Sequence, residues 1–281
     1  MGTLGEKKLF LLDMDGTLYL GDSLFPGVTD FLRHVKERGG RALFLTNNSS
    51  RGVEQYREKM NRLGIATEVE DYFTSVDATI LFLQERYGAG AKQMKIYGAG
   101  TESFRRQLRK AGFQVTDERE PGVELLLSGF DTELTFQKLE DACILLKEGV
   151  DWIATNPDWV CPTWYGFVPD CGSVCEMLSR ATGRKPEFVG KPEPLMARAA
   201  MKKAGYDAGQ TLMIGDRIYT DIACGVNAGV DTALVLSGET DEQTAAASSI
   251  RPTWIFRDIQ QLLEAMRREE APGRRSFFNC L

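Results

Sequence analysis

The sequence predicts an α/β fold built around a parallel sheet. Short apolar runs that are typical of buried strands alternate with amphipathic helical patterns along the 281-residue chain. A first set of these runs covers both ends of the chain, at residues 9–12, 42–45, 188–189, 212–214, 233–236 and 254–256. Polar residues follow several of the runs directly. Because ligands of open parallel sheets bind outside the carboxyl ends of the strands, this pattern also predicts a site at one edge of the sheet.

The helices are predicted from apolar residues that recur three and four positions apart. One such stripe, Val28, Phe31, Leu32 and Val35, has the single histidine, His34, beside it. We interpret His34 as a helix-surface residue. A single histidine rules out multi-histidine metal sites and disfavours a catalytic triad. Further helical stripes run through residues 53–63 and 259–266.

The middle of the chain carries its own alternation of strands and helices. Strand-like runs at 94–97, 124–127 and 152–154 are separated by helical stripes at 104–111 and 136–146. Another helix is expected to begin at Ser173, which has capping-box spacing to Glu176, and to stop at Gly183. We therefore predict an inserted domain over residues 85–185, with residues 1–84 and 186–281 forming the core.

Composition and charge limit the class of protein. The chain is 43% hydrophobic and 26% charged, as is ordinary for a globular protein, and its net charge is −6. Its basic residues are scattered, so we expect no nucleic-acid polymer as a partner. No signal-like segment and no apolar run of about 20 residues is found, which predicts a cytoplasmic protein without a membrane partner. The six cysteines are interpreted as reduced thiols. A zinc cluster of Cys161, Cys171 and Cys175 is the less favoured alternative.

The most informative segment is the first apolar run together with the residues directly after it. This run leads into Asp13, Met14, Asp15 and Gly16. Side chains two positions apart on an extended chain point to the same side, so Asp13 and Asp15 can share a site, and Gly16 allows a sharp turn. Two close carboxylates repel each other, and a divalent cation relieves the repulsion. The segment therefore predicts a metal site, with a plain turn after a strand as the alternative.

Polar tips also follow two other strand-like runs of the first set. One tip contains Thr46 and Asn47, and another contains Asp216, with Asp221 five residues later. A further strand-like run is followed by Lys191, which adds a cation. Because parallel strands end at the same edge of a sheet, we expect these tips to converge on one crevice.

In this order, the tips resemble the four motifs of the haloacid dehalogenase superfamily of phosphohydrolases. The chain is similar to the NagD subfamily, which is related to p-nitrophenyl-phosphate phosphatases, in four segments: Asp-Met-Asp-Gly-Thr-Leu-Tyr, Leu-Thr-Asn-Asn-Ser-Ser, Val-Gly-Lys-Pro, and Ile-Gly-Asp-Arg with Thr-Asp. The resemblance runs over nearly the whole chain. It implies a Rossmann-like parallel-sheet core with an α/β cap domain inserted between the second and third motifs.

The resemblance implies a catalytic role for the first motif. Asp13 would be the nucleophile that forms an aspartyl-phosphate. Asp15 would protonate the leaving oxygen and then deprotonate the attacking water. A Mg²⁺ ion would be held by Asp13, by the backbone carbonyl of Asp15 and by Asp216. Related ion pumps carry threonine in place of Asp15, so an aspartate here argues for hydrolysis.

The other motif residues would bind and stabilise the phosphoryl group. By the same resemblance, Thr46 and Asn47 would donate hydrogen bonds to its oxygens, and Lys191 would supply a fixed positive charge as both a catalytic and a substrate-binding residue. Arg217 is a further expected substrate-binding residue. Asp221 would orient the metal ligands.

These expectations predict Mg²⁺-dependent hydrolysis of small phosphorylated metabolites, such as nucleoside monophosphates or sugar phosphates. A phosphotransferase or phosphomutase on the same residues is the alternative, and a non-catalytic binding protein is less favoured. A large cap would exclude macromolecular substrates. Some relatives associate through their caps, so self-association through the cap is a further expectation.

Two features of the middle segment allow two interpretations each. The run from Gly98 to Ser103 follows a strand and opens a helix, and it could hold a nucleotide phosphate. A strand–turn–helix of the cap is favoured because the third glycine is missing. A second group of residues could form either the specificity surface or the core of the cap: Thr155, Asn156, Pro157, Asp158, Trp159, Trp164, Tyr165 and Phe167.

Overall fold

A computed structural model describes residues 2–163 and 165–270, so Trp164, Cys280 and the tail beyond Glu270 lie outside the described residues. The chain forms two compact units. Of the described residues, the first unit holds those up to Leu45, Leu63–Ile65 and those from Ala197 onward. The second holds Thr46–Arg62 and Ala66–Met196. The boundaries predicted at residues 85 and 185 stay a prediction.

A six-stranded sheet confirms the predicted α/β class. Its strands, in their order across the sheet, are β15 (Trp254–Phe256), β14 (Asp231–Val235), β13 (Thr211–Gly215), β1 (Leu9–Leu12), β4 (Arg41–Thr46) and β5 (Tyr72–Thr74). The central strand β1 pairs in parallel with β13 on one side and β4 on the other. All four residues of β1 are buried, as expected for a strand covered on both faces. The chain order reverses between β1 and β13, where ligands of such sheets bind.

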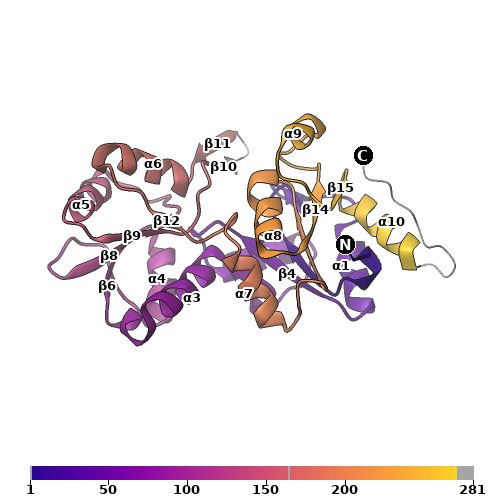
Figure 1. Ribbon diagram of the computed structural model, residues 1–281, viewed down its shortest axis with the longest axis horizontal. Coiled ribbons are helices and arrows are strands. Elements are labelled where there is room, and N and C mark those ends of the chain that lie inside the picture. Colours follow the sequence, from indigo (N-terminus) through magenta and orange to yellow (C-terminus); the bar gives the residue numbers. More distant parts are fainter. Residues whose placement is uncertain (1, 164, 271–281) are drawn as a thin grey trace. The chain divides into compact units, whose positions relative to one another are not determined.

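Helices α1 (Val28–Glu37), α2 (Val53–Arg62) and α10 (Ile259–Glu270) form where the apolar stripes predicted them. The helices α7 (Leu195–Ala204), α8 (Ala223–Ala228) and α9 (Glu242–Ala247) were not predicted. Helices α1 and α10 lie side by side (Figure 1). His34 lies on α1, where its Nε2 is 3.1 Å from Glu270 of α10. A small antiparallel hairpin, β2 (Tyr19–Leu20) and β3 (Ser23–Leu24), follows β1.

The second unit has a sheet of its own. Its strands, in order across the sheet, are β12 (Glu187–Phe188), β9 (Asp151–Ala154), β8 (Val123–Ser128), β6 (Lys95–Ala99) and β7 (Gln114–Thr116). The helices of this unit include α3 (Ser75–Tyr87), α4 (Glu102–Lys110), α5 (Phe136–Lys147) and α6 (Cys171–Thr182). A separate antiparallel pair, β10 (Val160–Thr163) and β11 (Gly166–Pro169), precedes α6. Figure 1 shows α4, α5 and α6 around the strands of this unit.

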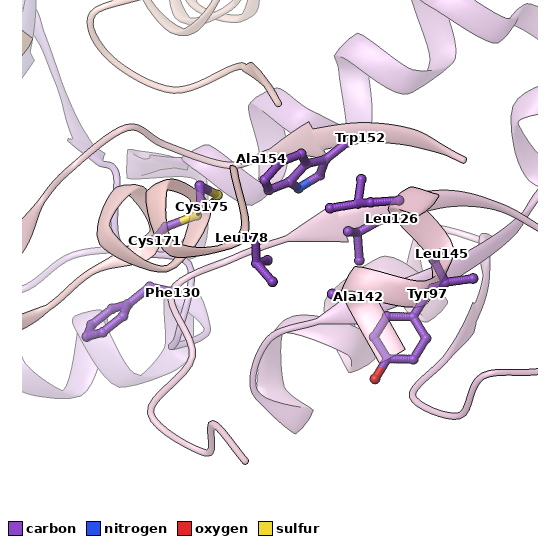
Figure 2. Packing of buried hydrophobic residues seen from close by; sticks show 11 residues of the cluster. Tyr97, Leu126, Phe130, Ala142, Leu145, Trp152, Ala154, Cys171, Cys175 and Leu178 are labelled. Carbon is purple, nitrogen blue, oxygen red and sulfur yellow. Dashed lines mark hydrogen bonds between the residues drawn. The ribbon is translucent and has the colours of Figure 1, made fainter. Parts of the chain in front are cut away.

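One apolar cluster packs α5 and α6 onto the second sheet. Tyr97, Leu126 and Trp152 come from three neighbouring strands and are buried together with Cys171 and Cys175 of α6 (Figure 2). Trp152 Nε1 donates to Ser128 Oγ at 2.9 Å, which satisfies the one polar group of its ring. The five described cysteines form no disulfide with one another, and Cys171 and Cys175 act as packing thiols in this cluster.

Two expectations about this part of the chain need correction. The sequence predicts the run at 188–189 as a core strand, but β12 pairs with β9 in the second sheet. Helix α6 begins after Asp170, whose side chain accepts from the Cys171 N–H, so Ser173 is not its N-cap. The strands β7, β10 and β11 were not predicted. Gly183 does end α6, with φ of 73°. No helix in residues 2–163 and 165–270 has the length and apolarity needed to cross a bilayer.

Candidate active site

The pairing of β1 with β13 brings the predicted acidic residues to one place. Leu12 lies opposite Ile214 in the register, and the Asp13 N–H donates to the Ile214 carbonyl oxygen at 2.9 Å. Asp13 follows β1 directly, and Asp216 follows β13 directly. Because the two strands are parallel, both residues lie at the same carboxyl edge of the sheet.

Asp13, Asp216 and Asp221 form an acidic cluster at this edge. Each offers one carboxylate oxygen, and the three oxygens lie within 4.8 Å of one another. Asp221 comes from the short helical turn Ile218–Ile222 and is a member of the cluster itself, whereas the sequence suggested only that it orients other ligands. Asp216 and Asp221 are 2% and 1% exposed. Carboxylates this close and this deeply buried repel one another when they are ionised.

The electrostatics of the cluster fit a divalent cation. Burial raises the pKa of Asp216 to about 7, and the neighbouring charge of Asp221 adds to the rise. Both effects disfavour the ionised form of Asp216, and a bound cation offsets both. Three carboxylate oxygens are the hard ligands that Mg²⁺ and similar ions prefer. The residues present therefore fit the predicted metal, with Asp13, Asp216 and Asp221 able to hold it.

Three glycines make room for the acidic cluster. A Cβ atom added at Gly16 or at Gly238 would overlap the Asp216 carboxylate, and one at Gly215 would overlap Asp221. Gly16 also has φ of 85°, which side-chain-bearing residues rarely adopt. These three positions require glycine because the carboxylates pack directly against the backbone.

A loop that the sequence analysis missed holds Asp216 in place. The Glu239 N–H donates to Asp216 Oδ2 at 2.7 Å, and the Thr240 N–H donates to the Asp216 carbonyl at 3.2 Å. Ser237 Oγ donates to the Gly16 carbonyl at 2.8 Å. This loop, residues 237–240, follows β14 at the same edge of the sheet. A further polar tip, the fifth after a predicted strand, was the signal that could have revealed it.

Arg217 has an ionic partner in the same loop. Its Nε lies 2.8 Å from Glu239 Oε2, and its side chain is 15% exposed. Arg217 thereby fixes the residue whose N–H binds Asp216. Contact between Arg217 and a substrate stays a prediction.

We expect Gly238→Ala to weaken divalent-cation binding. The added methyl group would displace the Asp216 carboxylate, and changes around metal ligands typically cost about 10- to 100-fold in affinity. Titration calorimetry with Mg²⁺ measures the effect. Gly90→Ala is the matched control, since its Cβ would meet no heavy atom within 4 Å. Equal Mg²⁺ affinity in Gly238→Ala and the parent protein would contradict this description of the cluster.

Asp15 lies beside the acidic cluster on the same segment. The side chain of Met14, between the two aspartates, is buried, whereas Asp13 and Asp15 are half-buried. This alternation is expected when neighbouring side chains point to opposite sides. Tyr19 Oη donates to Asp15 Oδ2 at 3.5 Å, and the Gly16 N–H donates to the Tyr19 carbonyl at 2.9 Å. Tyr19 is thus a partner of Asp15 that the sequence analysis did not identify.

The second unit brings Thr46, Asn47 and Lys191 together. Thr46 ends β4, and its Oγ1 accepts from the Asn48 N–H at 3.2 Å. Asn47 Oδ1 accepts from the Lys191 N–H at 2.9 Å, and Asn47 Nδ2 donates to the Lys191 carbonyl at 2.9 Å. Lys191 is 2% exposed. The first unit thus gathers the predicted acids and Arg217, and the second places the Asn47 amide, next to Thr46 in the chain, against the backbone of Lys191.

Packing decides between the two interpretations of the run from Gly98 to Ser103. A Cβ at Gly98 would lie 2.8 Å from Val115 Cγ1, and one at Gly100 would overlap Phe104. The Thr101 side chain caps α4 by accepting from the Phe104 N–H at 3.2 Å. Packing therefore explains both glycines, and the Thr101 side chain occupies the start of the helix. The favoured interpretation as a strand–turn–helix agrees with these contacts.

The aromatic residues near β10 and β11 do not form the core of the second unit. Trp159, Tyr165 and Phe167 are 56%, 62% and 63% exposed. Asn156, by contrast, is fully buried, and its Nδ2 donates to the Asn47 carbonyl at 2.8 Å. The suggestion that Asn156 lies on a specificity surface is therefore wrong.

Family models match both ends of the chain. A model described as haloacid dehalogenase-like hydrolase matches residues 10–114, and one described as HAD-hydrolase-like matches residues 188–262. The chain is 32% identical to an acid sugar phosphatase of Staphylococcus aureus, with 92% of this chain and 97% of that protein covered. It is 35% identical to the 5'-nucleotidase YutF of Bacillus subtilis, with 88% and 93% covered.

Two solved structures of phosphatases are also similar to this chain. A 4-nitrophenylphosphatase from Thermotoga maritima superimposes with a TM-score of 0.87 at 38% identity, covering 94% of this chain and 98% of that one. A glycerol phosphate phosphatase from Mycobacterium tuberculosis, solved in complex with magnesium, superimposes with a TM-score of 0.86 at 29% identity, covering 93% and 78%.

Proposed function

The chain belongs to the haloacid dehalogenase-like hydrolases as a NagD-like phosphatase, and from this premise we propose that it hydrolyses small phosphomonoesters through an aspartyl-phosphate on Asp13. Nucleoside monophosphates and sugar phosphates are the proposed substrate classes. Two relatives are named as a 5'-nucleotidase and an acid sugar phosphatase, and these names support the choice.

The acidic cluster is the observation that carries the proposal. Asp13 is half-buried, while Asp216 and Asp221 are almost completely buried. A nucleophile must reach its substrate, whereas a residue that only holds a metal need not. The difference in exposure favours Asp13 as the attacking carboxylate and Asp216 as a metal ligand.

In the proposed first step, a carboxylate oxygen of Asp13 attacks phosphorus opposite the ester oxygen. The phosphorus–oxygen bond to the leaving alcohol breaks as the bond to Asp13 forms, and Asp15 gives its proton to the leaving oxygen. Tyr19 Oη, 3.5 Å from Asp15 Oδ2, restricts the orientation of that carboxyl group.

In the proposed second step, water attacks the same phosphorus. Asp15, now ionised, takes a proton from the water, and the bond between phosphorus and the Asp13 oxygen breaks. Inorganic phosphate leaves and both aspartates return to their starting states. A group with both acid and base capacity is needed beside the nucleophile, and Asp15 supplies it.

The proposed cofactor is Mg²⁺, held by Asp13, the Asp15 backbone carbonyl and Asp216, with Asp221 beside it in the cluster. Bound there, it would neutralise charge on the phosphoryl oxygens. The protein's own contribution is to keep the carboxylates fixed. The Glu239 N–H holds Asp216 Oδ2, and the glycines around Asp216 leave room for its carboxylate.

Thr46, Asn47 through its backbone, Arg217 and Lys191 are the proposed phosphoryl-binding residues. The Thr46 hydroxyl and the Asn47 segment would donate hydrogen bonds, and Lys191 would balance the negative charge of the transferred group. A buried ammonium such as that of Lys191 acts in a low dielectric, where its effect on a nearby anion is larger than in water. We further propose that the protein is cytoplasmic.

We also propose that it self-associates through the inserted domain. Light scattering would measure the mass of the assembly.

A phosphate-release screen tests the proposed function. We expect release from nucleoside monophosphates or sugar phosphates with Mg²⁺ and a loss of at least about 100-fold after EDTA treatment, restored by added Mg²⁺. Asp13→Asn protein provides the blank. Transfer of the phosphoryl group to an added alcohol, without free phosphate, would favour the phosphotransferase alternative. Release that is unaffected by EDTA would contradict the proposed metal dependence.

A further inference from the structure

We infer that the Asn47 side chain is a positioning group for Lys191, held in place by Asp158, and that it is not a side-chain ligand of the phosphoryl group. This inference rests on the proposed function, in which Lys191 stabilises the transferred phosphoryl group. It concerns the second unit alone and uses contacts made within that unit.

The hydrogen bonds of Asn47 account for every donor of its side chain. A carboxamide has two N–H donors. Nδ2 donates to the Lys191 carbonyl at 2.9 Å and to Asp158 Oδ1 at 3.0 Å. Oδ1 accepts from the Lys191 N–H at 2.9 Å. The side chain therefore has no N–H left with which to bind phosphate while this network is intact.

The geometry of the network fixes the backbone of Lys191. The amide of Asn47 pairs with both the N–H and the carbonyl of one residue, as a neighbouring strand would. Two hydrogen bonds to the same residue restrict both its position and its rotation. Lys191 is buried, so water cannot readily replace these two hydrogen bonds. The pairing therefore fixes the backbone position from which the Lys191 side chain extends.

Gly190 provides independent evidence that the Asn47 amide must lie close to the backbone next to Lys191. A Cβ atom at Gly190 would lie 2.6 Å from Asn47 Oδ1 and 2.5 Å from the Thr155 carbonyl oxygen. Any side chain there would separate Asn47 from Lys191. The glycine before Lys191 thus leaves room for the Asn47 amide.

Residues 155–158 hold Asn47 from the other side. Asp158 accepts from Asn47 Nδ2, and Asn156 Nδ2 donates to the Asn47 carbonyl at 2.8 Å. Asn156 Oδ1 accepts in turn from the Asp158 N–H at 3.1 Å. These two side chains, both buried, form one continuous network with Asn47 and the backbone of Lys191. The segment therefore supports a catalytic lysine, in addition to any contact that its neighbours make with substrate.

A double-mutant cycle on kcat tests the inference. Lys191→Ala should lower kcat by about 100- to 1,000-fold, and Asn47→Ala should lower it by about 10- to 100-fold. If Asn47 acts through Lys191, adding Asn47→Ala to Lys191→Ala should lower kcat by less than about 3-fold more. Losses that multiply would mean that Asn47 acts on the substrate independently, which would overturn the inference.

A substitution that adds a negative charge at Asn47, with a matched control, complements the double-mutant cycle. Asn47→Asp keeps the acceptor but places an oxygen against the Lys191 carbonyl and Asp158, so kcat should fall by at least about 10-fold. Asn61→Asp makes the same chemical change on α2 in the same unit. Asn61 is exposed and takes no part in this network, so a loss below about 3-fold is expected. Equal losses in the two variants would contradict the specific role of Asn47.

Hydrogen exchange provides a measurement that does not depend on activity. The Lys191 N–H, which donates to Asn47 Oδ1, should exchange at least about 10-fold faster in Asn47→Ala, while the amides of β8 exchange as before. Unchanged protection of Lys191 would overturn the inference. Loss of protection throughout the second unit would indicate unfolding. Asp158→Ala, which removes the acceptor of Asn47 Nδ2, then replaces Asn47→Ala in both measurements. Phosphate release that is independent of Asp13 would overturn the proposed function without altering the exchange result.

Discussion

Asp13→Asn is expected to lower kcat for phosphate release by at least about 1,000-fold, because the variant lacks the nucleophile on which both chemical steps depend. The neutral amide has the same shape and retains the backbone bond from the Asp13 N–H to Ile214. It also removes one charge from a cluster of three buried or half-buried carboxylates. The metal-free variant should therefore be at least as stable as the parent protein, which thermal unfolding in EDTA would measure.

Asp22→Asn is the control for this substitution. Asp22 is exposed in the turn between β2 and β3, nine residues after Asp13, and undergoes the same chemical change. Its kcat should stay within about 2-fold of the parent value. Retention of more than about a tenth of the activity by Asp13→Asn would show that another group performs the attack.

Asp15→Asn is expected to have an effect that depends on the leaving group. General acid–base catalysis contributes about 100- to 10,000-fold, and the alcohol of a sugar phosphate leaves poorly without a proton. Nitrophenolate leaves readily without one. With 4-nitrophenyl phosphate, the first step should therefore survive in Asp15→Asn, while the second step slows because no base remains to activate water.

The expected observation is a burst of nitrophenol followed by slow turnover. The burst should equal about one nitrophenol per active site, as is typical of a covalent intermediate that accumulates. Stopped-flow absorbance measures it. Similar losses for an alkyl and an aryl ester, with no burst, would argue against Asp15 as the proton donor.

Five strands of the six-stranded sheet and the helices α1, α2 and α10 were predictable because their patterns are local. The buried run of β1 and the apolar stripes of α1 and α10 each lie within a dozen residues of sequence. The acids after β1 and β13 were predictable for the same reason, together with the rule that parallel strands end at one edge. Elements without a clear period, such as the half-buried β10, gave no such signal.

The contacts that hold the site in place were not predictable in the same way. Asn47 meets Asp158 and Lys191, which lie 111 and 144 residues away. Asp216 is held by the backbone N–H of Glu239. Every residue except proline has such a donor, so the residue type does not reveal this contact. Such partners depend on the three-dimensional path of the chain. Only the glycines at positions 16, 190 and 238, which the packing requires, mark these approaches in the sequence.

The central claim is that phosphate passes through a covalent bond to Asp13. The most direct test is mass spectrometry of Asp15→Asn protein that is mixed with 4-nitrophenyl phosphate and Mg²⁺, quenched in acid and digested. We predict one added phosphoryl group on the peptide that contains Asp13, with fragmentation assigning it to that residue. Nitrophenol release with no phosphoryl group on the peptide, or with the group on another residue, would contradict the claim.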